Sequence, residues 1–288
     1  MRQIVLQSGD DNLAPRVTEE SRYPNIDSEY TVLQYTGQML SIRTNQNYGI
    51  KEWGGSRAAS QQGMAIYGNL LVSFSNGSTK YIYTIGADGT LTQVSSFTLA
   101  TGHSNALQFA PTIESGQVFP YLYVAGLDNN KCYVVSIAAD YTATIVQTIT
   151  STIGQTMIGD DGYLWGNGRE GDTGPRIFIK FRKVAVSEGD ITLTEDDVID
   201  RWETDKIYST ADVTAQGYSV KYGKIWFCYG ASGAGQKRGV DVYDTATHRR
   251  LAEIELSSYT TVEFEDVDFY DNALLIATYQ SKIFEVRF

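Results

Sequence analysis

Five polar residues recur at one position in the sequence, at or just ahead of the start of an apolar, strand-like run. They are Gln62, Asn105, Gln155, Gln216 and Glu265. If these runs lie side by side around one axis, amide and carboxyl groups converge there. They can then order water, bind a polar ligand or hold a cation such as calcium. Buried amides usually have hydrogen-bond partners within the protein, so the same side chains are also compatible with a purely structural ring.

Acid–base chemistry has one candidate centre, His103, which stands two residues before Asn105. A histidine at the start of a strand can contact a ligand or act as a general base. Glu265 or Asp160 would supply the accompanying carboxylate. No serine or cysteine nucleophile with an orienting carboxylate is evident beside His103, and a loop histidine that caps backbone groups explains it equally. We therefore assign no catalytic residue, and count His103 with the five polar residues as an expected ligand-binding residue.

Two acidic groups have both a chemical and a structural interpretation. Paired carboxylates can hydrolyse glycosides or bind metal. Asp160-Asp161-Gly162 is also typical of a hairpin turn, and Asp266 and Asp268 alternate on a strand, so they share one face. The spacing of the cysteines and histidines predicts no metal site.

Composition favours an all-β protein. Aromatic residues make up 12% of the 288 residues, with 27 glycines and 5 prolines, which suits half-buried strands joined by tight turns. The net charge of -11 argues against binding to nucleic acid or an anionic membrane. No apolar run is long enough to span a bilayer, and no signal peptide is expected in this chain. Two thiols, Cys132 and Cys228, lie in apolar runs and are predicted to be buried and free.

A repeated sequence motif, which we call the repeated phrase, positions the strand-like runs. It reads strand, tight turn, strand over residues 62–74, and returns over 216–227 and more loosely over 155–165. A period near 50 residues indicates a repeat architecture. The phrase divides the chain into an N-terminal arm (1–29) and a β-propeller (30–288) with blades at about 57–102, 103–152, 153–205, 206–257 and 258–288.

The last unit offers only three strands, and residues 30–55 can supply the missing one. Closing a propeller with strands from both ends of the chain removes exposed sheet edges. We therefore predict a five-bladed β-propeller whose last blade is closed by an N-terminal strand. Six blades, with residues 30–55 as a separate blade, and an open β-sandwich are the alternatives. The Gly-rich stretch 166–174 is expected to be a loop at one rim of the channel.

Three resemblances bear on function. The Gln-Gly strands at Gln62-Gly63-Met64 and Gln216-Gly217-Tyr218 resemble those of the glutamine cyclotransferase family, which are five-bladed propellers; residues 72–78 lack that family's Ser-Thr-Gly segment. The same strands, with His103-Ser104-Asn105 following, resemble uncharacterised propellers of gut Bacteroidetes and their phages. Residues 11–21 resemble the start of phage tail-fibre and baseplate proteins.

These features favour a non-catalytic binding or structural propeller, a phage tail or baseplate adhesin that recognises a glycan or a neighbouring virion protein. The expected location is a virion or a cell surface, and the expected partner is a glycan or a virion or cell-surface protein. The alternative is a propeller enzyme, either a glycan hydrolase or lyase or a cyclotransferase-like enzyme, acting in the channel funnel. No cofactor is expected beyond a possible channel-bound cation.

Overall fold

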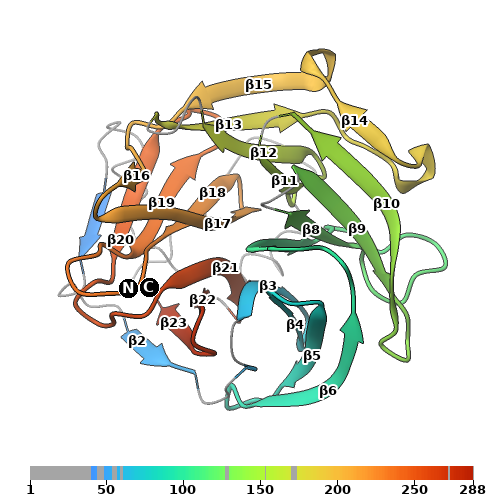
Figure 1. The fold of residues 1–288 in the computed structure, drawn as a ribbon, viewed down its shortest axis with the longest axis horizontal. Coiled ribbons are helices and arrows are strands. Elements are labelled where there is room, and N and C mark those ends of the chain that lie inside the picture. The colour runs from blue at the N-terminus through green and yellow to red at the C-terminus, as the bar shows by residue number, and fades with distance from the viewer. Residues whose placement is uncertain are drawn as a thin grey trace, which may run out of the picture.

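The computed structural model describes residues 40–43, 49–53, 57–58, 61–126, 130–152, 154–169, 174–271 and 273–287. Five sheets, antiparallel except for one parallel edge strand in each of two of them, stand around a common axis, with β3, β7, β11 and β21 as the innermost strands of four sheets (Figure 1). The prediction of an all-β, five-bladed β-propeller is therefore confirmed. The predicted N-terminal arm, residues 1–29, lies outside the described residues.

Each blade is a sheet whose main strands follow one another along the chain. Blade 1 contains β3 (Gln61–Tyr67), β4 (Leu70–Ser75), β5 (Thr79–Ile85) and β6 (Leu91–Thr98). Blade 2 contains β7 (Ala106–Phe109), β8 (Leu122–Gly126), β9 (Lys131–Ile137) and β10 (Ala143–Ser151). Blade 3 contains β11 (Gln155–Ile158), β12 (Leu164–Arg169), β13 (Arg176–Phe181) and β15 (Val198–Glu203).

Blade 4 contains β16 (Ser209–Thr210), β17 (Val213–Lys221), β18 (Lys224–Tyr229), β19 (Gly239–Asp244) and β20 (Arg250–Glu255). Blade 5 contains β21 (Phe264–Tyr270), β22 (Ala273–Thr278) and β23 (Ile283–Arg287). Two short 3₁₀ helices, Val186–Glu188 and Glu195–Asp197, flank a further short strand, β14 (Ile191–Leu193).

An N-terminal strand completes blade 5, as predicted. Strand β2 (Gly49–Glu52) pairs antiparallel with β23. The junction continues past the strand, because the Trp53 indole N–H donates to Glu285 over 2.6 Å. The preceding strand, β1 (Leu40–Arg43), pairs in parallel with β20 at the outer edge of blade 4. The N-terminal segment therefore fastens two blades, where the sequence predicted one.

The blade 3 segment also contributes one outer strand to blade 2. The segment after β13 first sends β14 to pair in parallel with β10 of blade 2, and then returns as β15 to pair with β13 of its own blade. The expectation of a loop over residues 166–174 is wrong for its first part. Gly166 to Arg169 belong to β12 and pair with β13, because glycines tolerate extended backbone and the neighbouring strand supplies hydrogen bonds.

The core lies between the blades. Strand β3 shows the reason: Met64 and Ile66 pack against blade 5, whereas Ala65 packs against blade 2. Inner strands are therefore apolar on both faces, which removes the simple alternation of a half-exposed strand. Cys132 and Cys228 are buried free thiols in this core, as predicted. In the described part of the chain, no helix is long and apolar enough to cross a membrane.

Candidate functional site

The repeated Gln-Gly pair is a β-bulge. In β3 the pairing register moves from Gln61 opposite Ser75 to Met64 opposite Ser73, which leaves Gln62 and Gly63 opposite one residue. The same shift in β17 places Gln216 and Gly217 in a bulge. A bulge redirects a side chain out of the regular alternation of the strand. It thus turns each glutamine away from the sheet faces.

The structure brings the five predicted ring residues together at the same end of the inner strands, and all five are at most 7% exposed. The Asn105 amide donates to Gln216 Oε1 over 3.2 Å and accepts a hydrogen bond from the Gln155 amide. Gln216 in turn donates to Glu263 over 3.0 Å. The Gln62 amide lies 3.5 Å from a carboxylate oxygen of Glu265. The ring therefore ties blades to one another.

The inner strands of blades 2 and 4 meet across the axis. A Cβ atom added to Gly217 would lie 1.8 Å from the carbonyl oxygen of Asn105 and 2.6 Å from that of Glu265. Further along the axis, the Gln108 amide donates to the Val220 carbonyl over 2.9 Å and accepts from the Val220 N–H over 3.0 Å. At these levels the axis is filled by backbone and amide groups.

Asp266 and Asp268 also connect neighbouring blades through hydrogen bonds. Both are fully buried, at 0% exposure. Asp266 accepts the N–H groups of Met64 and Leu107 over 2.9 and 3.1 Å, which links blade 5 to blades 1 and 2. Asp268 accepts the N–H of Ile66 over 2.6 Å and pairs with Lys221. Burial raises the pKa of both carboxyl groups. Among the described residues no group of three or more potential metal ligands occurs.

Glu265 has the electrostatics of an acid–base group. Burial, reinforced by the charge of Glu263, raises its pKa to about 8, although the Arg57 charge opposes this shift. Arg57 is itself buried and donates to Ser73 over 2.8 Å and to the Thr278 carbonyl over 2.6 Å. Its own pKa is lowered to about 10 by burial, so it remains charged at neutral pH.

The alternative catalytic set does not assemble in full. His103 is partly buried in the loop before β7, two residues from Asn105. Asp160 lies elsewhere: its backbone N–H donates to Val220 and its carboxylate accepts from the Tyr222 N–H. Tyr222 follows β17, whereas Gln216 is near its start, a separation on the order of 13–20 Å along the strand. Asp160 is therefore at the opposite end of the inner strands from Glu265.

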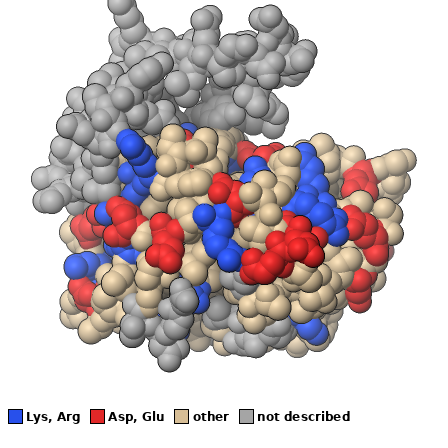
Figure 2. Space-filling view, turned by 90° about the horizontal axis from the view of Figure 1, so that it is seen from above, with Lys and Arg blue, Asp and Glu red and all other residues tan. Residues whose placement is uncertain are grey.

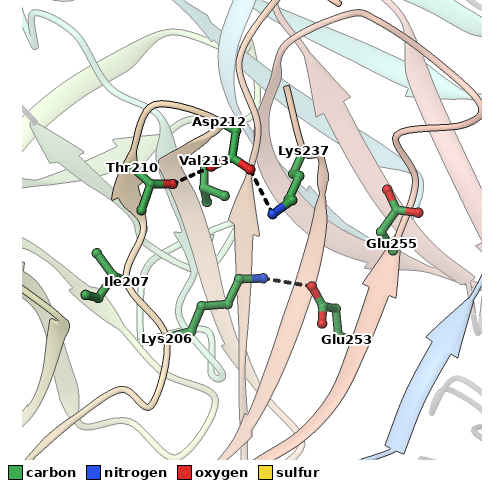
Figure 3. A pocket seen from close by; sticks show the side chains of 8 residues that line it. All are labelled: Lys206, Ile207, Thr210, Asp212, Val213, Lys237, Glu253 and Glu255. Atoms are coloured by element: carbon green, nitrogen blue, oxygen red, sulfur yellow. Dashed lines mark hydrogen bonds and ion pairs between the residues drawn. The ribbon is translucent and has the colours of Figure 1, made fainter. Parts of the chain in front are cut away.

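A second candidate site, which we call the blade-4 hollow, lies away from the axis. It encloses about 430 Å³ between the segment that leads from β15 to β17 and the outer part of blade 4. Its polar lining consists of Lys206, Thr210, Asp212, Lys237, Glu253 and Glu255. Figure 3 shows Lys206 pointing towards Glu253 and Lys237 pointing towards Asp212.

A buried network supports the floor of this hollow. The Lys206 ammonium lies 2.8 Å from carboxylate oxygens of both Asp241 and Glu253, and 3.8 Å from the ring centre of Tyr229. The Tyr208 hydroxyl donates to Asp241 over 2.5 Å. Asp241 is fully buried, and burial raises its pKa although Lys206 and Arg250 oppose the shift.

The sequence analysis missed this network. Asp241 stands between Val240 and Val242 in an otherwise apolar strand, and a carboxylate in such a place needs a buried partner. That signal was present in the sequence. The partner, Lys206, could not be named because it precedes Asp241 by 35 residues in a connecting segment.

Fold and packing define the chain as a five-bladed β-propeller with a closed axis. No protein-family model matches it, and no curated protein matches it. Glutaminyl cyclase of Myxococcus xanthus is similar, with a TM-score of 0.50, 11% identity, and coverage of 86% of this chain and 97% of that one. The tail fibre of Staphylococcus aureus phage P68 is similar, with a TM-score of 0.51 and 14% identity. That alignment covers 94% of this chain and 55% of the tail-fibre chain, so this chain spans about half of its length. At these identities the likeness establishes the fold alone.

Proposed function

We propose that the chain is a non-catalytic binding propeller of a phage tail or baseplate, which recognises a glycan or a neighbouring virion or cell-surface protein. The observation that carries the proposal is the use of the axial polar groups. The Asn105 side-chain amide donates one hydrogen bond to Gln216 and accepts one from Gln155. The Asp266 carboxylate accepts hydrogen bonds from backbone N–H groups of two other blades. Groups held in this way rigidify a scaffold, and binding then belongs to its loops and rim.

Two further observations support this proposal. The likeness to a phage tail fibre extends over 94% of the chain. The side of the molecule in Figure 2 carries basic and acidic side chains intermingled. A surface of mixed sign suits polyhydroxylated ligands, whose hydroxyl groups both donate and accept hydrogen bonds.

The test combines binding with a search for turnover. The purified chain is applied to an array of bacterial surface glycans, and each glycan that binds is then incubated with the chain and followed by mass spectrometry. We expect saturable binding that leaves the glycan unchanged. An antiserum against the chain is expected to label the tails of phage particles from the source culture in electron micrographs. Time-dependent conversion of a bound glycan would contradict the proposal.

One observation favours the enzymatic alternative, namely the pKa of about 8 at Glu265. A buried carboxyl group that is protonated near neutral pH can act as a general acid, and His103 lies in the loop at the same end of the axis. If the chain is an enzyme of this type, Glu265→Gln abolishes turnover and His103→Ala reduces it. Glu195→Gln, in an exposed ion pair with Arg201 on blade 3, is the matched control and leaves turnover unchanged.

A further inference from the structure

The blade-4 hollow has the size and the rigidity of a ligand site. Its volume of about 430 Å³ falls within the range of about 300–1,000 Å³ that is common for small-molecule sites. A second hollow of about 300 Å³ shares Lys237 and Glu255 with the first and follows the loop before β19. Because Lys237 and Glu255 line both hollows, the second adjoins the first, and a ligand of more than one ring can extend from one to the other.

The floor is organised before any ligand arrives. Lys206 is fixed by Asp241, Glu253 and the Tyr229 ring. Glu253 also accepts a hydrogen bond from the Tyr229 hydroxyl over 2.9 Å. Burial opposes ionisation of Glu253, but the hydrogen bond from Lys206, the charge of Lys206 and the hydrogen bond from Tyr229 outweigh it and lower the pKa of Glu253. Glu253 therefore enters a complex ionised, and neither side chain loses much conformational freedom.

The backbone of the rim is anchored by a buried arginine. Arg238 is 1% exposed, and its guanidinium donates to the carbonyl groups of Gly233, Thr261 and Val262 over 2.5 to 3.0 Å. These bonds fasten the loop before β19 to the segment that leads into blade 5. The adjoining Lys237 pairs with Asp212 over 2.7 Å.

The arrangement of charges selects the chemical class of the ligand. Two ammonium groups, Lys206 and Lys237, and three carboxylates, Asp212, Glu253 and Glu255, line the hollow together. An anionic ligand would face the carboxylates, whereas a cationic one would face the ammonium groups. A sugar hydroxyl donates one hydrogen bond and accepts two, so neighbouring hydroxyl groups can bridge a lysine and a carboxylate.

We propose that the blade-4 hollow, with its continuation along the loop before β19, binds a neutral oligosaccharide. This inference rests on the proposed function and assigns its glycan site to the outer part of blade 4. Lys206 and Glu253 contact the sugar at the floor, and Lys237 and Asp212 contact it at the rim.

The test uses the full chain and a panel of neutral and anionic bacterial-surface oligosaccharides on an array, followed by calorimetric titration of the strongest neutral binder. The double variant Asp212→Asn/Lys237→Met keeps the size of the rim side chains but removes both charges. We expect its affinity for the neutral oligosaccharide to fall at least tenfold. The matched control, Glu195→Gln/Arg201→Met, removes an exposed ion pair of similar length on blade 3 and should bind as the parent does.

The outcomes separate the site from the function. If the parent chain binds a neutral oligosaccharide and the rim variant binds it equally well, the site is wrong and the proposed function stands. If the parent chain binds no oligosaccharide of the panel, glycan recognition itself fails, and the site with it. Binding confined to anionic oligosaccharides refutes the charge argument. Melting curves of both double variants verify that loss of binding is not loss of fold.

Discussion

Replacing Gly217 by alanine tests whether the axis is closed. The added Cβ would lie 1.8 Å from the Asn105 carbonyl oxygen, 2.6 Å from that of Glu265 and 2.7 Å from Asp266 Oδ1. Two of these atoms are backbone of other blades and cannot rotate away. Overpacking usually costs about 1–3 kcal/mol, and we place this substitution at about 3 kcal/mol because three neighbours must move. With an unfolding entropy of about 2.1 cal/mol/K per residue, the melting temperature should fall by about 5 °C.

Differential scanning calorimetry measures this shift, and Gly77→Ala is its control. A Cβ atom at Gly77 would meet only the Ser75 hydroxyl, at 3.7 Å, an ordinary contact. That variant should melt within about 1 °C of the parent, as substitutions away from packed sites usually do. If Gly217→Ala also melts within about 1 °C of the parent, the blades do not meet at Gly217 and the closed axis is refuted.

Substitutions at Glu265, Lys206 and Asp241 probe the buried charges. The pKa of Glu265 is about 8 in the fold against 4.5 ordinarily, so the contribution of Glu265 to the parent's unfolding free energy is fully present below about pH 4.5 and is lost as the pH rises through 8. Glu265→Gln should remove up to about 4 kcal/mol of that decline between pH 5 and 9 in urea titrations; parallel curves would show that Glu265 does not titrate in this range. Lys206→Met leaves the Asp241 carboxylate short of a partner and should cost about 3 kcal/mol. Adding Asp241→Asn should restore part of this loss in a double-mutant cycle, and strictly additive losses would exclude the coupling.

Much of the architecture could be predicted from the sequence repeat. The Gln-Gly phrase predicts the number of blades and the end of the strands at which Gln62 and Gln216 lie, because equivalent positions in a repeat occupy equivalent places. The phrase does not reveal why glycine follows glutamine. That reason appears only in the pairing register, where the pair forms a bulge, and in the backbone of the neighbouring blade that lies against it.

The pairing of the outer strands β1 and β14 with other blades could not be predicted from the sequence. Strand β14 has three residues and β1 has four. Strands this short have no periodicity of their own, and an edge that happens to be available elsewhere in the fold decides their partner. Residues 166–169 show the converse case, in which glycines typical of a loop were recruited into β12 by the adjacent strand.

Of the two candidate sites, one could be predicted from the sequence and the other could not. The axial ring could be predicted because its members share a position in every repeat. The blade-4 hollow draws on a connecting segment, a loop and an outer strand, and its residues are individually ordinary charged side chains. Only the fold places Lys206 beside Asp241 and Glu253, so no spacing rule in the sequence could identify this site.

Strands β2 and β23 are hydrogen-bonded neighbours, yet the Trp53–Glu285 contact beside them joins residues 232 positions apart. A ribosome adds roughly 5–20 residues per second, so β2 emerges on the order of 10–50 s before its partner exists. During synthesis its edge is open to other chains, and nascent molecules on one messenger could pair through it. The ring closes last and slowly, as its high contact order requires. Production of this protein should therefore depend on translation rate and on chaperone supply.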